Sequence, residues 1–216
     1  MIVPHFEIHN IYGYSYHKVT YCALKNRFEE LNLNLRPFVL SRSFYAGSQK
    51  WGFIWTGDNN ATFPSLKYSI DQLLTINLCG YSACGADVGG FFGDPDEKLA
   101  KAWYQVNHFN YKYGAFNPFF RGHAHEATKR REPWCFSKET TDSIRESILM
   151  RYKLILFWYT CFFENSISGL PVLSPFWIRF PKWSKEYCNY SDSFVVGNKI
   201  VVYPFCNKKR FRLIII

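Results

Sequence analysis

Four polar side chains that could do chemistry recur at the ends of short apolar runs. Arg42 and His123 each close such a run, and Asp58 and Asp87 close two more. Each residue also has an ordinary interpretation. Arg42 could pair with a surface acid, Asp87 could cap a turn before two glycines, and His123 could be a hydrogen-bonded core histidine. Their joint recurrence at run ends favours a single polar site.

Asp58 has the most informative position of the four. It directly follows Gly57, at the end of an aromatic and β-branched run that contains Trp55. We therefore expect the carboxylate to lie among apolar side chains. Burial disfavours the charged form of a carboxylate, which is the property that a general acid needs near neutral pH. A second carboxylate should then act as the base or nucleophile.

The elements that must position these residues alternate between strand and helix. Buried strands are predicted over residues 36–42, 52–56, 79–86 and 170–177. Helices are predicted over residues 65–77, 97–106 and 137–168. Ser65 and Asp94 are the expected N-caps of the first two helices, and Gly169 is expected to end the third.

Apolar residues at helical spacing predict which helix faces are buried. On the first helix these residues are Leu66, Ile70, Leu73 and Leu74. On the third helix they are Ile144, Ile148, Tyr152, Ile155 and Tyr159.

About four strand-then-helix units fit this pattern, with polar residues at the carboxyl end of each strand. In a β/α barrel, the site lies at that end. A complete barrel needs about 250 residues, so four units predict an α/β fold that is half of one. Short alternating strands over residues 193–196 and 199–203 indicate the start of a separate β domain. We place the boundary near residue 182, giving domains 1–182 and 183–216.

Composition bounds the remaining possibilities. The 216 residues are 48% hydrophobic and 20% aromatic, which is ample for a packed core. The net charge of +9 is spread out, apart from short basic clusters at 129–131 and 208–212, so we expect solvated surface charge and no nucleic-acid partner.

The seven cysteines have no zinc-site spacing, and no metal is expected. The longest apolar run, 154–163, is too short to span a bilayer, and residues 1–5 do not resemble a signal peptide.

Five longer motifs carry a family resemblance. They occupy residues 36–49, 55–59, 84–92, 118–125 and 130–134. In this order they resemble glycoside hydrolase family 31, and the similarity runs from about His9 to Pro204. The resemblance implies a (β/α)8 catalytic barrel followed by β-sandwich domains, of which this chain would hold the C-terminal half of the barrel and the beginning of a β-sandwich. It implies no cofactor.

The resemblance also implies roles for individual residues. Six positions match a sugar-binding and catalytic site: Asp58 as general acid/base, Arg42 and His123 as groups that hydrogen-bond the sugar, Trp55 and Phe91 as aromatic walls, and Asp87 as a residue that shapes the pocket floor. Members of the family retain anomeric configuration, so a nucleophilic carboxylate is also required.

The nucleophile motif of the family, Trp-x-Asp-Met-Asn-Glu, does not occur in these 216 residues. Glu7, Glu29 and Glu30 lie in no comparable context. We therefore expect this chain alone to be an inactive and poorly stable fragment. Residues 106–112 interrupt the family pattern, either as a loop insertion or as an error in the gene structure.

The resemblance implies a fragment of a retaining α-glucosidase that acts on terminal α-linked glucose. The motifs are most similar to the branch that trims N-linked glycans in the endoplasmic reticulum lumen, whose catalytic chain pairs with a β subunit. Two alternatives stay open. One is another activity of the family, of maltase or α-xylosidase type, and the other is a non-catalytic truncated product that binds carbohydrate.

Overall fold

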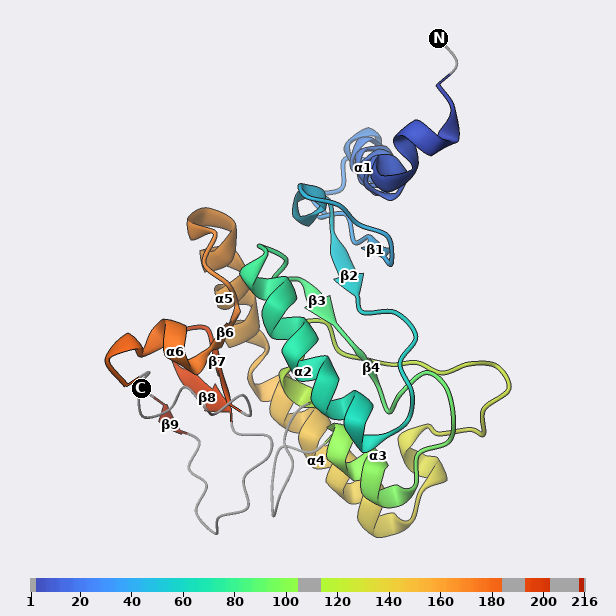
Figure 1. The fold of residues 1–216 in the computed structure, drawn as a ribbon, viewed down its shortest axis with the longest axis vertical. Coiled ribbons are helices and arrows are strands. Elements are labelled where there is room, and N and C mark those ends of the chain that lie inside the picture. The colour runs from blue at the N-terminus through green and yellow to red at the C-terminus, as the bar shows by residue number, and fades with distance from the viewer. Residues whose placement is uncertain (1–2, 105–113, 184–192, 203–213, 216) are drawn as a thin grey trace. The chain divides into compact units, whose positions relative to one another are not determined.

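The fold is seen in a computed structural model, which describes residues 3–104, 114–183, 193–202 and 214–215 (Figure 1). The chain divides into two compact units, Met1–Trp55 and Thr56–Ile216. The interruption of the family pattern at residues 106–112 lies outside the described residues. Among the described helices, none has both the length and the apolar content needed to cross a membrane.

The first unit consists of a long helix and a short pair of parallel strands. α1 (His5–Glu30) is followed by β1 (Leu40–Ser41), the 3-10 helix η1 (Ser48–Lys50) and β2 (Phe53–Trp55). β1 and β2 pair in parallel, with Leu40 opposite Phe53. The predicted strands over residues 36–42 and 52–56 are therefore present but shorter than expected, and residues 36–42 are not buried as predicted.

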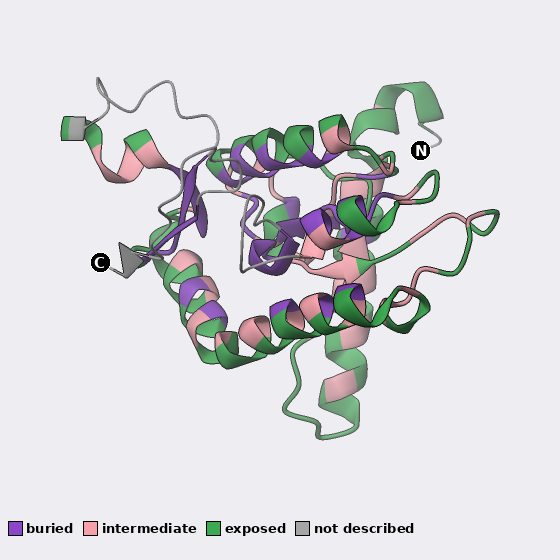
Figure 2. Cartoon of the chain, turned by 90° about the horizontal axis from the view of Figure 1, so that it is seen from below, coloured by how far each residue is buried: buried purple, intermediate pink, exposed green. Residues whose placement is uncertain are grey.

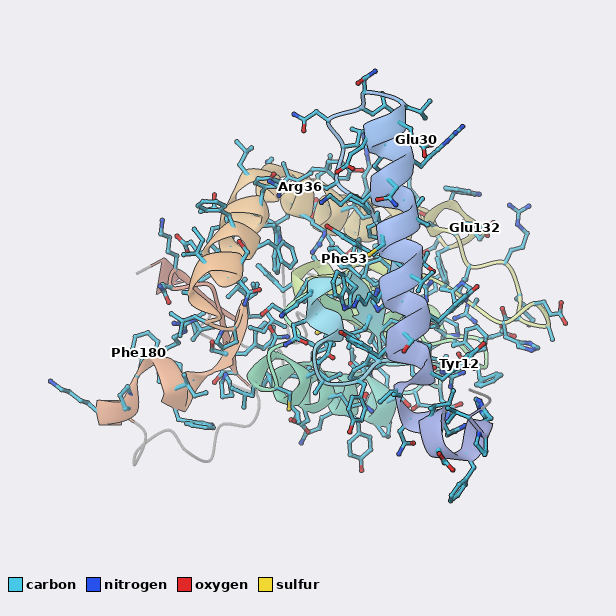
Figure 3. All side chains as sticks on the ribbon, turned by 90° about the horizontal axis from the view of Figure 1, so that it is seen from above. Tyr12, Glu30, Arg36, Phe53, Glu132 and Phe180 are labelled. Atoms are coloured by element: carbon cyan, nitrogen blue, oxygen red, sulfur yellow. The ribbon has the colours of Figure 1, made fainter. Side chains whose placement is uncertain are left out.

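Most side chains of α1 point into solvent, as the sticks around the helix show for Tyr12 and Glu30 (Figure 3). His17 is the exception, with 2% of its surface exposed. It lies against the strand pair, because a side chain at Gly52 would come within 2.7 Å of the His17 Nε2 atom.

The second unit contains the parallel β/α pattern that the sequence predicts. β4 (Asp87–Val88) leads through α3 (Glu97–Tyr104) to β5 (Arg121–Gly122), and β4 and β5 pair in parallel. α2 (Phe63–Leu78) and β3 (Cys84–Gly85) precede this unit. The short helix η2 (Gly114–Phe116) lies before β5, and η3 (Pro133–Cys135), α4 (Lys138–Lys153) and α5 (Ile155–Ser168) follow it.

The core of this unit lies along one face of α2 and around α3 (Figure 2). Leu66, Ile70, Leu73 and Leu74 are all buried, as their spacing predicts. Leu99 and Trp103 are the largest buried side chains of α3, which packs against α4. α2 also packs against β3 and β6 (Leu173–Pro175).

Two helix starts differ from the prediction. Thr62, and not Ser65, caps α2: the Ser65 N–H donates to Thr62 Oγ1, and Pro64 fits the first turn. Asp96, and not Asp94, accepts a hydrogen bond from the first turn of α3, at the Leu99 N–H. In both cases, the cap is the residue whose side chain can reach a free N–H of the first turn.

The helix predicted over residues 137–168 is two helices, which meet at Leu154. Tyr152, near the end of α4, and Ile155 and Tyr159, beyond the break, are 67%, 57% and 59% exposed. The predicted apolar stripe is therefore wrong from Tyr152 onward, and Trp158 and Cys161 are the buried residues of α5. Gly169 ends α5 with φ of +71°, as predicted.

The last part of the described chain is an antiparallel sheet. β6 (Leu173–Pro175) pairs with β7 (Phe194–Val196), which pairs with β8 (Ile200–Val202), and β8 pairs with β9 (Ile214–Ile215). Two short segments, α6 (Phe176–Arg179) and η4 (Pro181–Trp183), lie between β6 and β7. The predicted short strands after residue 182 are present, and the domain boundary at that residue stays a prediction.

Candidate active site

Asp87 lies at the centre of the polar groups in the second unit. It is fully buried, directly opposite Arg121 in the register of β4 and β5. Arg121 donates to Asp87 Oδ1 from Nη2 at 2.6 Å and from Nε at 3.2 Å. Burial raises the pKa of Asp87, and the hydrogen bond and charge of Arg121 oppose that rise. Asp87 Oδ2 has no hydrogen-bond partner among the described residues.

Two other predicted residues lie near Asp87. The charge of His123 lowers the pKa of Asp87, and the charge of Asp58 raises it. Asp58 directly precedes Asn59, whose side chain donates to the Asp87 carbonyl, and His123 directly follows β5, the strand that pairs with β4. The structure therefore brings Asp58, Asp87 and His123 together, although they come from three separate segments of the chain.

Asp58 is exposed, and the expectation that apolar side chains bury it is wrong. The turn explains the difference. Gly57 has φ of +84°, a left-handed conformation that L side chains rarely adopt, and it redirects the chain immediately before Asp58. The next residue, Asn59, is held by hydrogen bonds, so the carboxylate of Asp58 is left at the surface, accessible to a ligand.

Asn59 connects the segment that carries Asp58 to the loop after β4. Its Nδ2 atom donates to the Asp87 carbonyl at 3.1 Å. The Phe91 N–H donates to Asn59 Oδ1 at 2.9 Å and to the Asn59 carbonyl at 2.7 Å. The side chain of Asn59, which follows Asp58 in the chain, thus binds both ends of the turn between Asp87 and Phe91.

Phe91, a predicted wall of the site, is in contact with His123, a predicted sugar-binding residue. Their ring centroids are 5.3 Å apart. His125 supports the same loop, since its N–H donates to the Phe91 carbonyl at 3.0 Å and its ring lies 5.4 Å from that of Phe92. The loop after β5 therefore packs on the loop after β4.

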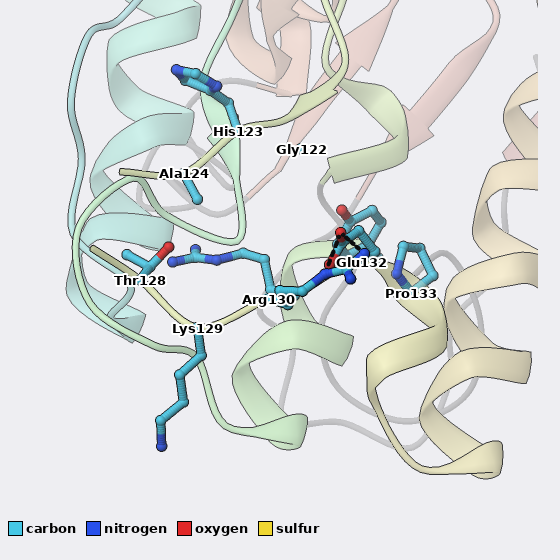
Figure 4. A pocket seen from close by; sticks show the side chains of 10 residues that line it. Gly122, His123, Ala124, Thr128, Lys129, Arg130, Glu132 and Pro133 are labelled. Atoms are coloured by element: carbon cyan, nitrogen blue, oxygen red, sulfur yellow. Dashed lines mark hydrogen bonds and ion pairs between the residues drawn. The ribbon is translucent and has the colours of Figure 1, made fainter. Parts of the chain in front are cut away.

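A pocket of about 440 Å³ opens beside His123 (Figure 4). Its lining includes three cationic side chains, Lys129, Arg130 and Arg131, and comes from Tyr104, Gly122, His123, Ala124 and residues 128–133. Arg130 is paired with Glu132 at 2.7 Å in this lining. In the described ranges, no three His, Cys, Asp or Glu side chains gather as metal ligands would.

The other two predicted residues belong to the first unit. Arg42 directly follows β1 and lines a separate pocket of about 380 Å³, together with His9, Tyr12 and Phe44 among others. Trp55 is the last residue of β2 and is partly buried. The structure therefore places Asp58, Asp87, Phe91 and His123 on one unit and Arg42 and Trp55 on the other.

Comparison with known proteins identifies the family. Residues 2–161 match the profile of the glycosyl hydrolases family 31 TIM-barrel domain. The chain belongs to glycosyl hydrolase family 31. This confirms the resemblance and the TIM-barrel α/β fold class.

Curated proteins that are similar to this chain include α-glucosidases. A probable glucan 1,3-alpha-glucosidase from Oryza sativa subsp. japonica is 50% identical over 199 residues, which cover 92% of this chain and 20% of the relative. Neutral alpha-glucosidase AB from Dictyostelium discoideum is 47% identical over 200 residues, covering 93% of this chain and 20% of the relative. The chain thus spans about a fifth of the length of these curated relatives.

Solved structures of the family agree. The DNJ-bound glucosidase II alpha subunit superposes with a TM-score of 0.85 at 39% identity, over 95% of this chain and 21% of that one. A family 31 α-glucosidase from Bacteroides thetaiotaomicron gives a TM-score of 0.80 at 33% identity, over 94% of this chain and 32% of the other.

Sequence reasoning missed several residues that hold this family 31 site together. Asn59, Arg121, His125 and Arg131 all lie within or beside the motifs, yet none was given a role. Their importance rests on contacts over long sequence separations, such as the 32 positions between Asn59 and Phe91. The signal that could have identified these residues was their position inside the motifs, close to predicted site residues.

Proposed function

We propose that this chain is part of a retaining α-glucosidase in which Asp58 is the general acid/base. The supporting observation is the hydrogen-bonded connection from Asn59, the neighbour of Asp58, to Asp87 and Phe91. This connection holds an accessible carboxylate beside an aromatic ring and a histidine. A proton donor next to a sugar-sized aromatic wall is what glycoside cleavage requires.

The proposed reaction has two steps. Asp58 first donates its proton to the glycosidic oxygen while a second carboxylate attacks the anomeric carbon, so the leaving alcohol departs and a glycosyl-enzyme bond forms. Asp58 then takes a proton from water, which attacks the anomeric carbon and releases glucose and the nucleophile. Because the 216 residues contain no Trp-x-Asp-Met-Asn-Glu motif, we propose that the nucleophile belongs to a part of the barrel other than these residues.

The remaining predicted residues bind the sugar in this proposal. Arg42 and His123 donate hydrogen bonds to its hydroxyl groups, and Trp55 and Phe91 form apolar walls for its ring faces. Asp87 is paired with Arg121 and buried, so it shapes the floor beneath the sugar and carries no proton in the reaction.

The proposed placement in the full protein follows the family. The β/α units form the C-terminal half of a (β/α)8 barrel, and β7, β8 and β9 begin a β-sandwich. The parallel pairing of β4 with β5 and the antiparallel pairing of β7 with β8 are consistent with that division.

The proposed substrate is terminal α-linked glucose on N-linked glycans in the endoplasmic reticulum lumen. Support comes from solved neighbours at 39% identity, namely a Glc1Man2-bound glucosidase II alpha subunit and a heterodimeric complex of the catalytic subunit with the binding domain of a regulatory subunit. A regulatory β subunit is accordingly the proposed partner.

A non-catalytic role is the second candidate, because the nucleophile motif is not in these residues. In that case the chain would bind carbohydrate through Phe91, His123 and Arg42 without turnover. We expect the isolated 216-residue chain not to hydrolyse α-glucosides. Hydrolysis by the isolated chain that Asp58→Asn abolishes would contradict this expectation.

The central experiment replaces Asp58 in the full-length protein. Asp58→Asn should lower kcat for an unactivated α-glucoside by about 10²–10⁴-fold, the usual contribution of a general acid/base. Asp142→Asn, an exposed change on α4 with the same loss of charge, should leave kcat unchanged. Equal rates for Asp58→Asn and the wild type would refute the proposed role.

Substrate preference separates the family activities. Faster hydrolysis of α-1,3-linked than α-1,4-linked glucosides by the full-length protein is expected for the N-glycan-trimming branch. The reverse preference would favour a maltase-type enzyme, and preference for an α-xyloside would favour an α-xylosidase.

A further inference from the structure

The loop that carries Phe91 is unusually rich in left-handed glycines. Gly89, Gly90 and Gly93 have φ of +98°, +86° and +79°. Glycine has the largest conformational freedom in the unfolded chain and no side chain with which to pack. A loop of this composition therefore needs contacts from outside itself if the aromatic ring within it is to keep one position.

Arg131 supplies such contacts on one side of the loop. Its Nη1 atom donates to the Gly90 carbonyl at 2.5 Å and lies 3.3 Å from the Gly89 carbonyl. Its Nη2 atom donates to the Gly93 carbonyl at 2.5 Å. The three carbonyls bracket Phe91, and a planar guanidinium is the side chain that can bind several of them at once.

The guanidinium of Arg131 is held in place at this loop. Arg131 is partly buried, and that burial lowers its pKa, against the opposing charges of Asp94 and Tyr104. The segment that carries Arg131 is itself anchored, since the Lys129 N–H donates to Asp94 Oδ1 at 2.9 Å. Arg131 is thus held in one position, where it supports the loop, and is not a mobile surface cation.

The loop is held from a second direction by Asn59, which accepts the hydrogen bond of the Phe91 N–H. The position of the Phe91 ring is thereby defined by the segment beside Asp58 and by the segment after β5. Both ties are to the backbone of the loop.

We propose that Arg131 is a positioning residue that holds Phe91 as a wall of the sugar site. This rests on the proposed function, because Phe91 is assigned there to the sugar. In this role Arg131 acts through the loop backbone and not through contact with a reacting atom. Its loss should weaken sugar binding through Phe91 and leave the proton transfer by Asp58 largely intact.

A structural role alone would have a different signature. If Arg131 only stabilised the fold, its replacement would lower the melting temperature while the folded fraction kept its affinity. If it positions Phe91, the folded variant should bind the sugar ring less tightly in the ground state and the transition state alike. Such uniform loss raises KM and leaves kcat nearly unchanged.

The test uses the full-length protein and the variants Arg131→Met and Arg131→Lys. Arg131→Met should raise KM for a p-nitrophenyl α-glucoside, and Kd for DNJ, by about tenfold, with kcat within about threefold of the wild type. Arg131→Lys keeps the charge but not the fork of donors, so its values should lie between those of the wild type and Arg131→Met. Arg145→Met, an exposed change on α4, is the matched control and should behave as the wild type.

Hydrogen exchange adds a readout that needs no turnover. The amides of residues 90–93 should exchange faster in both Arg131 variants than in the wild type, while amides of α2 should not change. Unchanged KM, Kd and exchange in Arg131→Lys would overturn the proposal, even if Arg131→Met failed to fold. A wild-type protein that neither hydrolyses the glucoside nor binds DNJ would instead refute the proposed function. The exchange result would still show whether Arg131 stabilises the loop that carries Phe91.

Discussion

Asp87 and Arg121 form an ion pair across the parallel strands β4 and β5, at the register position where the two residues face each other. The Arg121 Nη2 atom lies 2.6 Å from Asp87 Oδ1, Asp87 is fully buried, and the Arg121 side chain is 27% exposed. The loops that follow these strands carry Phe91 and His123. The pair therefore fixes the strand ends from which Phe91 and His123 extend.

Removing the cation of this pair should destabilise the protein strongly. Arg121→Met leaves the buried carboxylate of Asp87 without its partner, at a cost on the order of 3 kcal/mol. The double variant Arg121→Met/Asp87→Asn removes the unpaired charge as well, so it should regain part of the lost stability. Urea unfolding of the full-length protein measures both. A double variant less stable than Arg121→Met would contradict this account of the pair.

Glu97 gives the second prediction, which concerns low pH. Its carboxylate accepts hydrogen bonds from the N–H and Oγ of Ser137 and from Thr140 Oγ1, at the start of α4. These bonds lower the pKa of Glu97 to about 2. Because the folded pKa lies below the usual 4.5, the stabilisation is present above that pH and is lost as pH falls toward 2.

Glu97→Gln should therefore lower the melting temperature near neutral pH and have a smaller effect near pH 3. Glu139→Gln is a suitable comparison, since Glu139 is exposed and pairs with Lys101. Thermal unfolding at both pH values decides the matter. An equal loss at both pH values would show that the carboxylate charge is not what stabilises the start of α4.

The sequence predicted the fold best where one local signal was sufficient. The apolar spacing on α2 identified its buried face, and Gly169 marked the end of α5 because a left-handed residue is needed there. The break at Leu154 was missed, since both flanking segments have helical composition and no glycine or proline separates them. Only packing shows that the exposed residues Ile155 and Tyr159 do not continue the inner face.

The site shows the same limit. Asp58, Asp87, Phe91 and His123 were identified from the residues and the family resemblance, and the structure brings these four together. The burial of Asp58 was predicted wrongly, because it depends on the turn at Gly57 and not on the apolar residues before it. Arg131 and Gly90 are 41 positions apart, so no local pattern reports their hydrogen bond.

Asn59 gives a third prediction, on catalysis. Asn59→Ala removes the donor to the Asp87 carbonyl and one acceptor for the Phe91 N–H, so Asp58 and Phe91 should lose their fixed separation. A displacement of about 1 Å can cost up to 10²-fold, and we expect kcat/KM of the full-length enzyme to fall about 10-fold to 100-fold. Steady-state kinetics on an α-glucoside measure this. Asn60→Ala, the exposed neighbour, should stay within about twofold. Equal kinetics for the two variants would remove Asn59 from the site.

His17 gives the last prediction, on stability between pH 5 and 8. It is 2% exposed in α1, and neither ring nitrogen has a hydrogen-bond partner among the described residues. Burial lowers the pKa of His17 below the usual 6.5, so the folded state favours the neutral ring. The unfolded chain then binds more protons below pH 6.5, and stability must fall as pH drops from that value toward the folded pKa.

His17→Leu places an apolar side chain of similar reach at this position and removes the titration. The slope of unfolding free energy against pH over this window should therefore be shallower in His17→Leu than in the wild type, as urea unfolding at several pH values would show. An identical slope would mean that His17 gains its proton without cost, and that the ring reaches water in the folded protein.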